Sequence, residues 1–191
     1  MTRINYFAYG SNMSEQRLIS RVPSATKICI ATLKEYQLRF NKKSIDGSGK
    51  ANAHYSGNHD DFIIGVVFTI DEQDKSTLDN EEKGYAPTTV HIDGIGDVYL
   101  YVANLDKINE SLKPYDWYLF HLKFGVTLNN IEHTYAKQII NHVTLTLERR
   151  NIDNYKRGLN ECISLYSGAE LHTDLHDDFA ALKQAQEKLE I

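Results

Sequence analysis

The chain has 191 residues, with 21 Lys or Arg against 26 Asp or Glu, so its formal net charge is −5. Its 41% hydrophobic and 25% charged residues are ordinary for a globular protein, which excludes a disordered or low-complexity chain. The longest apolar run, residues 62–68, is far shorter than the roughly 20 residues of a membrane span, so no membrane partner is expected. The sequence lacks a continuous basic stripe, which disfavours nucleic-acid binding.

Residues 1–6 lead directly into strand-like sequence, without the apolar segment of a secretory signal, so a cytoplasmic location is expected. The two cysteines, Cys29 and Cys162, are too few for a disulfide framework or for a cysteine-based zinc site. We therefore expect two buried free thiols.

Segments rich in β-branched and aromatic residues predict strands in the first part of the chain. They are residues 4–9, 26–40 (long enough to bend or split), 62–70, 88–92 and 98–102. The polar segment 41–61, with Gly-Ser-Gly at 47–49, is predicted to be a loop that joins two strands.

Helical periodicity fills the intervals and then dominates the chain after Pro114. Ser14 is the expected N-cap of a short helix to residue 21, and Asp71 that of a helix to about residue 83, closed by Gly84. The later helices are predicted at 115–124 (ending at Gly125), 130–142, 151–166 and 178–189. Strands first and helices last indicate an α+β fold.

Two segments contain residues suited to chemistry. In residues 6–13 a strand ends in Gly-Ser-Asn before a helical pattern, so backbone N–H groups can point at an anion or a developing oxyanion. A plain strand-to-helix turn is the commoner reason for this pattern. In residues 78–85 several acids lie near a helix end, where a solvated face is the commoner role. The spacing does not choose between Asp79, Glu81 and Glu82 as a catalytic carboxylate.

The N-terminal string Tyr-Phe-Ala-Tyr-Gly-Ser-Asn at 6–12, followed some seventy residues later by Leu-Asp-x-x-Glu at 78–82, resembles the γ-glutamylcyclotransferase (AIG2-like) family. Pro-Ser-Ala at 23–25, Gly-Val-Val-Phe at 65–68 and Tyr118 seven residues ahead of Gly125 are further landmarks in the family order. The resemblance covers about residues 4–142. It implies a small mixed β-barrel-like sheet with surrounding helices in residues 1–142, and leaves 143–191 as a C-terminal helical extension that we expect to pack on the same domain.

The resemblance also implies roles for individual residues. The family's catalytic glutamate falls on Glu82, and further pocket residues fall on Tyr101 and Tyr118. The loop that cradles the substrate falls on Tyr6, Phe7, Ala8, Tyr9, Gly10, Ser11 and Asn12. The implied reaction is cyclisation of a γ-glutamyl group to 5-oxoproline with release of an amine or amino acid. Glu82 would act as general acid and base, with no cofactor and no metal.

Two kinds of alternative remain open. Within enzymes, the chain is a γ-glutamylamine cyclotransferase or a biosynthetic enzyme that removes a γ-glutamyl protecting group. In another class, it is a non-catalytic ligand-binding protein on the same scaffold, because a fold does not fix a function. The last helix, with its apolar face, either packs on the domain or mediates self-association as a homodimer, and packing is the favoured interpretation.

Overall fold

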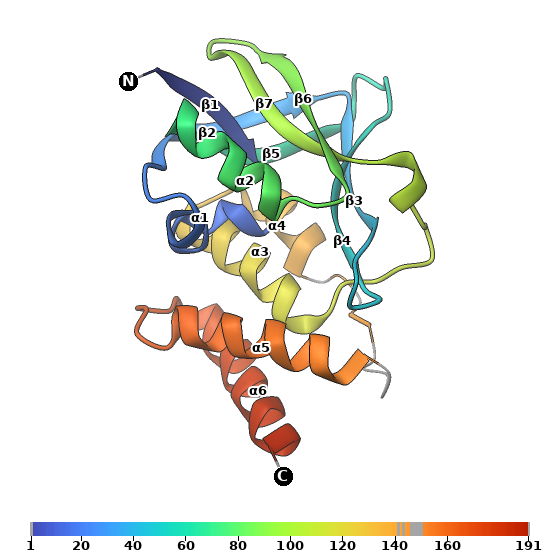
Figure 1. Cartoon of the computed structure of the whole chain (residues 1–191), viewed down its shortest axis with the longest axis vertical. Helices are drawn as coiled ribbons and strands as arrows, with labels where there is room; N and C mark the ends of the chain where they lie inside the picture. Colours follow the sequence, from blue (N-terminus) through green and yellow to red (C-terminus); the bar gives the residue numbers. More distant parts are fainter. Residues whose placement is uncertain (1, 141, 143, 146–150, 191) are drawn as a thin grey trace.

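The computed structural model describes residues 2–140, 142, 144–145 and 151–190 (Figure 1). The strands are β1 (Arg3–Ala8), β2 (Thr26–Lys34), β3 (Tyr36–Lys43), β4 (Gly49–Tyr55), β5 (Phe62–Asp71), β6 (Tyr85–Ile92) and β7 (Gly96–Ala103). The α-helices are α1 (Glu15–Arg21), α2 (Lys75–Glu81), α3 (Asp116–Leu128), α4 (His133–Ile140), α5 (Ile152–Tyr166) and α6 (Thr173–Glu190). Short 3-10 turns are η1 (Ser11–Met13), η2 (Glu72–Asp74) and η3 (Leu105–Lys107). The predicted α+β fold class is confirmed.

A mixed five-stranded sheet in the order β2-β5-β1-β7-β6 forms the centre of the fold. Strand β1 is its middle strand, antiparallel to β5 and parallel to β7. It is flanked on both sides, so its C-terminal half reads as a continuous buried apolar run. The first residues of the predicted substrate loop therefore lie in the most protected strand of the sheet.

The described strands do not close into a barrel. The two edge strands, β2 and β6, face each other across a groove of about 630 Å³ without pairing. The groove is lined by backbone and side chains of residues 29–36 and 90–95, and none of the predicted site residues reaches it. The sheet is thus barrel-like in curvature and open along one seam.

The structure corrects the prediction for residues 26–61. The long predicted strand splits at Glu35, whose φ of 66° lies in the left-handed region and turns the chain between β2 and β3. The predicted loop contains strand β4, which pairs with β3 as a two-stranded sheet. Its polar composition hid the strand, because buried Asn52 takes part through side-chain hydrogen bonds to Asn41 and to the Ala103 N–H.

Helix ends differ from prediction where tertiary contacts decide them. Ser14 caps α1 as predicted, and its Oγ accepts the Arg17 N–H at 3.4 Å. Asp71 makes no capping bond, because η2 intervenes before α2 begins. Helix α3 runs on through Gly125 to Leu128, and α6 begins at Thr173, five residues earlier than predicted.

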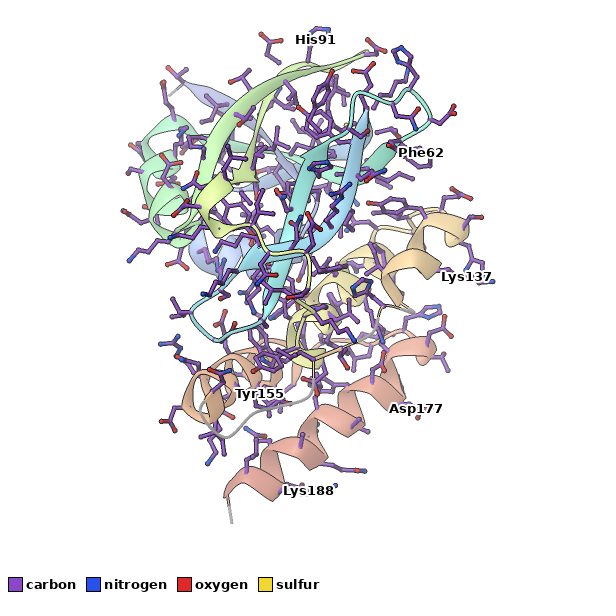
Figure 2. All side chains as sticks on the ribbon, turned by 90° about the vertical axis from the view of Figure 1, so that its right-hand side faces the viewer. Phe62, His91, Lys137, Tyr155, Asp177 and Lys188 are labelled. Carbon is purple, nitrogen blue, oxygen red and sulfur yellow. The ribbon has the colours of Figure 1, made fainter. Side chains whose placement is uncertain are left out.

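Helix α3 lies between the sheet and the two C-terminal helices, as Figure 1 shows. It is buried along most of its length, because one side meets the sheet region and η1 while the other meets α5 and α6. In the side view of Figure 2, Tyr155 on α5 and Asp177 and Lys188 on α6 lie at the opposite end of the molecule from His91 on β6. No described helix is both long and apolar enough to cross a membrane. Cys162 is buried as predicted, whereas Cys29 is only half-buried.

Candidate functional site

Glu82 follows α2 directly and is the C-cap of that helix, with its N–H bonded to Leu78 O at 3.1 Å. Its carboxylate turns inward, where Asn12 Nδ2 donates to Oε1 at 2.9 Å. The same Asn12 nitrogen lies 3.1 Å from the Tyr6 hydroxyl oxygen. The loop after β1 and the end of α2, which are seventy residues apart in sequence, therefore meet at this carboxylate.

The neighbouring acids of the 78–85 segment face elsewhere. Asp79 accepts a hydrogen bond from the Tyr101 hydroxyl at 2.6 Å and pairs with Lys75. Glu81 is exposed and lies 3.7 Å from Arg21 Nε. Of the three acids that the spacing left open, only Glu82 lines a pocket.

The pocket at Glu82 has aromatic walls. It is lined by Tyr6, Tyr9, Gly10, Ser11, Asn12, Ala51, Glu82, Tyr85, Tyr101 and Tyr118. These residues come from β1, η1, β4, β6, β7, α3 and the end of α2, so the site exists only in the complete fold. Phe7 and Ala8 do not line it: both are fully buried in β1, with the Phe7 ring against Gly65.

Hydrogen bonds fix the tyrosine rings of the pocket. Tyr118 Oη accepts the Ala51 N–H at 3.0 Å, and the Tyr85 hydroxyl donates to Ala51 O at 2.7 Å. The Tyr9 hydroxyl donates to the backbone oxygen of Tyr101. Because each hydroxyl is anchored to backbone, the rings form a shaped wall.

Gly10 is required where the loop passes the pocket wall. A Cβ built on Gly10 would lie 3.2 Å from Ala51 Cβ and 3.5 Å from Tyr118 Oη. In the 3-10 turn that follows, the first internal hydrogen bond runs from Met13 N–H to Gly10 O. The N–H groups of Ser11 and Asn12 precede that bond and have no acceptor within the turn.

The electrostatics of the pocket favour a protonatable Glu82. Burial raises the pKa of its carboxyl, while the charges of Arg21, Arg17 and Lys42 and the hydrogen bond from Asn12 oppose that rise without cancelling it. Burial also raises the pKa of Tyr118, to about 12, with Glu82 adding to the rise. The tyrosines are thus neutral hydroxyls near pH 7, and Glu82 is the group that can exchange a proton.

One acceptor in the pocket is unsatisfied. Asn12 Oδ1 is buried and has no hydrogen-bond partner among the described residues. A buried unpaired acceptor is costly, and it points to a donor supplied by a ligand. The pocket itself holds only about 30 Å³, close to the volume of a single water, so side chains at its mouth must move apart to admit a substrate.

Sequence reasoning missed four residues of this site. Tyr85 and Ala51 line the pocket, while Arg17 and Arg21 supply positive charge behind Glu82. The spacing of the two arginines, four residues apart on one face of α1, was a readable signal. Ala51 carried none, because it lies in the strand that was predicted as a loop. Within the described part of the chain, no group of three or more His, Cys, Asp or Glu side chains is placed to hold a metal ion.

The family model described as gamma-glutamyl cyclotransferase, AIG2-like, matches residues 6–119, more than half of the chain. The chain belongs to this family. The match begins at Tyr6 in β1 and ends just after Tyr118 in α3, so it contains all the residues that line the pocket. Helices α5 and α6 lie beyond it.

Relatives and solved structures agree with this membership. A human protein named gamma-glutamylcyclotransferase is 32% identical over 84 residues, which are 40% of this chain and 43% of that protein. The bovine protein of the same name is 27% identical over 70% of this chain and 76% of its own length. The chain thus spans less than half the length of the human relative. A solved gamma-glutamyl cyclotransferase shares the fold, with a TM-score of 0.68 at 22% identity over 82% of this chain and 99% of that one.

Proposed function

We propose that this chain is a γ-glutamylcyclotransferase, which converts a γ-glutamyl compound into 5-oxoproline and a free amine or amino acid. The α-amine nitrogen attacks the side-chain carbonyl carbon of the same glutamyl group and closes a five-membered ring. The bond from that carbon to the leaving nitrogen breaks, and the leaving nitrogen takes up a proton. Atoms balance without any co-reactant.

The reaction suits a pocket with no nucleophilic serine or cysteine. Nucleophile and electrophile are tethered in one molecule, so ring closure has a high effective molarity once the substrate is folded into a near-attack geometry. We therefore propose that neither a covalent enzyme intermediate nor a metal takes part. A rigid tyrosine wall, anchored on the Ala51 backbone, is suited to hold the folded substrate.

Proton transfer is the task that remains for a side chain. The substrate amine arrives as an ammonium and must lose a proton, and the departing amine must gain one. We assign both steps to Glu82, since one carboxylate with a raised pKa can accept the proton and then return it.

The observation that carries the proposal is the pairing of Glu82 with Asn12. The Glu82 carboxylate and the unpaired Asn12 Oδ1 are two acceptors that face one small aromatic pocket. A substrate ammonium has the donors to satisfy both. The N–H groups at Gly10 and Ser11 would then meet either the developing oxyanion or the α-carboxylate, and oxyanion contacts are often worth about 3 to 4 kcal/mol per donor.

Glu82→Gln tests the proposal against a matched neighbour. The amide keeps the shape of the side chain and cannot take up a proton, so 5-oxoproline formation should fall by about a hundredfold or more. Glu81→Gln removes the same charge one residue away, on an exposed side chain, and should leave turnover within about threefold. The assay measures 5-oxoproline from γ-glutamyl amino acids, γ-glutamyl amines and glutathione.

Near-full activity of a folded Glu82→Gln protein would refute the role of Glu82. The panel member with the highest kcat/KM identifies the substrate class. Thermal stabilisation by γ-glutamyl compounds without any 5-oxoproline would instead identify a binding protein on this scaffold.

A further inference from the structure

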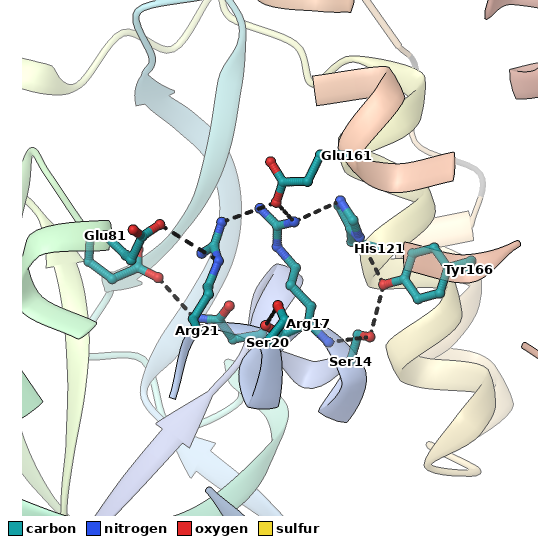
Figure 3. A network of polar contacts seen from close by, with 10 residues as sticks. Ser14, Arg17, Ser20, Arg21, Glu81, His121, Glu161 and Tyr166 are labelled. Atoms are coloured by element: carbon teal, nitrogen blue, oxygen red, sulfur yellow. Dashed lines mark hydrogen bonds and ion pairs between the residues drawn. The ribbon is translucent and has the colours of Figure 1, made fainter. Parts of the chain in front are cut away.

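A cluster of charged and polar side chains lies behind the pocket, between α1, α2, α3 and α5 (Figure 3). Glu161 on α5 is its only member from the C-terminal helices that carries a charge. Its Oε1 lies 2.5 Å from Arg17 Nη1 and 3.6 Å from Arg21 Nη2. The Arg17 side chain is 7% exposed and that of Glu161 is 50% exposed, so a surface carboxylate closes over a buried guanidinium.

Arg17 depends on Glu161 for charge compensation. Its Nη1 also lies 3.1 Å from His121 Nε2. Because a guanidinium only donates, Nε2 must be the accepting nitrogen and Nδ1 must carry the proton. Nδ1 then donates to Tyr166 Oη at 2.8 Å, and the Tyr166 hydroxyl donates to Ser14 Oγ at 2.8 Å. His121 is therefore neutral, and Glu161 is the one carboxylate within 4 Å of Arg17 in the described part of the chain.

Arg21 connects this cluster to the catalytic segment. Its Nε faces Glu81 Oε2 at 3.7 Å, while its Nη2 faces Glu161. Glu81 directly precedes Glu82. The two guanidinium groups thus lie between a carboxylate on α5 and the end of α2, as the chain of contacts in Figure 3 shows.

We propose that Glu161 is a positioning residue for the candidate active site: its carboxylate holds the guanidinium groups of Arg17 and Arg21 between α5 and the end of α2, and so fixes the positive charge that faces Glu82. The inference rests on the proposed role of Glu82. Because α5 lies outside the residues that the family model matches, Glu161 is a contribution of the C-terminal helices to a site built by the rest of the chain.

Several charged or titratable groups face this region from the elements around it. They are Arg17 and Arg21 on α1, Glu81 and Glu82 at the end of α2, Lys42 on β3, Lys50 on β4, His121 on α3 and Glu161 and Tyr166 on α5. Burial raises the pKa of Glu82, and Arg21, Arg17 and Lys42 oppose it. A negative charge at Glu161 offsets two of these cations. Its removal leaves them uncompensated, which stabilises the Glu82 carboxylate and lowers its pKa.

The test is the pH profile of the full chain with Glu161→Gln. The amide keeps an acceptor for Arg17 and loses only the charge. In 5-oxoproline formation, the acidic limb of kcat/KM should move to lower pH by about half a unit, which is about a threefold change in the proton-dissociation constant. Glu161→Asp keeps the charge and should bring the limb back toward its wild-type position.

Glu187→Gln is the matched control. Glu187 is an exposed acid on α6 that forms no ion pair with any residue the structure describes, so its loss should leave the acidic limb in place. An unchanged or raised limb in Glu161→Gln overturns the proposal, as does an equal shift in Glu187→Gln, which would mean a general effect of net charge.

A titration of the Glu82 carboxyl by ¹³C NMR separates this inference from the proposed function. If the wild type forms no 5-oxoproline from any γ-glutamyl compound, the proposed function fails. The NMR titration still decides whether Glu161 sets the charge at Glu82. A lower Glu82 pKa in Glu161→Gln supports the positioning role, and an equal or higher one refutes it.

Discussion

His121 is held as a neutral ring by the groups around it. Arg17 occupies its Nε2 with a donor, and Tyr166 accepts from its Nδ1. A second proton on the ring would place two donors face to face at 3.1 Å in a buried setting. Burial therefore lowers the pKa of His121 well below 6.5, and the charge of Arg17 lowers it further.

This geometry predicts how stability responds to acid. Below about pH 6.5 the unfolded chain takes up a proton at this histidine that the folded chain refuses, so the free energy of unfolding falls as pH drops. The slope from one such group approaches about 1.4 kcal/mol per pH unit. In His121→Gln, which offers an acceptor to Arg17 and a donor to Tyr166 without titrating, the fall between pH 7 and 5.5 should be shallower by that contribution. Urea denaturation at several pH values measures both slopes, and equal slopes would contradict the argument.

The sequence indicates residues that carry chemistry better than residues that support it. Glu82 and the loop at Tyr9 to Asn12 stand out because their types and order resemble a known family. Arg17, His121 and Glu161 carry no such pattern, since their roles arise from contacts over 104 and 144 residues of separation. No local rule brings such positions together.

At the level of elements, Gly125 shows how a tertiary contact overrides a local signal. A glycine often marks a helix end, and we predicted one there. Instead α3 continues, because the loop at Met13 crosses the helix at this point: a Cβ on Gly125 would lie 2.7 Å from Met13 Cβ and 3.0 Å from its carbonyl carbon. Asn129 Nδ2 holds the same loop by donating to Met13 O at 3.1 Å.

Gly125→Ala should therefore destabilise the fold, although alanine is the better helix former. Backbone atoms at Met13 and Ser14 must shift, at a cost of about 1 to 3 kcal/mol in the free energy of unfolding. Gly168→Ala is the control, because nothing lies within 4 Å of a Cβ built there. Urea denaturation compares the two. A stabilised Gly125→Ala protein would mean that the loop yields easily.

At the level of the whole molecule, the C-terminal helices share one core with the sheet region. On α3, Trp117 packs against Gly158 of α5, and Phe124 stacks on Tyr166 at 4.3 Å between ring centres. Phe120 meets Phe179 of α6 at 5.4 Å. Rings of this size provide much of a core's apolar burial.

A chain that ends at residue 145 should consequently lose cooperative folding. It would expose three aromatic side chains of α3 and leave the Arg17 guanidinium without a carboxylate partner. Circular dichroism should show no sharp thermal transition, in contrast to the full chain. A cooperative transition within a few degrees of the full chain would show that residues 1–142 form a domain that folds alone.

The α+β order and most helices are readable from periodicity, because a helix or strand with one apolar face repeats at a fixed spacing. The open seam between β2 and β6, the hidden strand β4 and the placement of α5 are not readable in this way. They depend on which strands find partners, on a buried asparagine and on packing between distant helices.

The separation of Arg17 and Glu161 has a consequence for biosynthesis. Every residue that lines the pocket has been translated by Tyr118, but the carboxylate that compensates Arg17 is added 43 residues later. A nascent chain that has only just produced α3 holds a guanidinium whose counter-charge does not yet exist. Domains generally fold from the N-terminus as they are made, whereas this site is electrically complete only after α5 has left the ribosome.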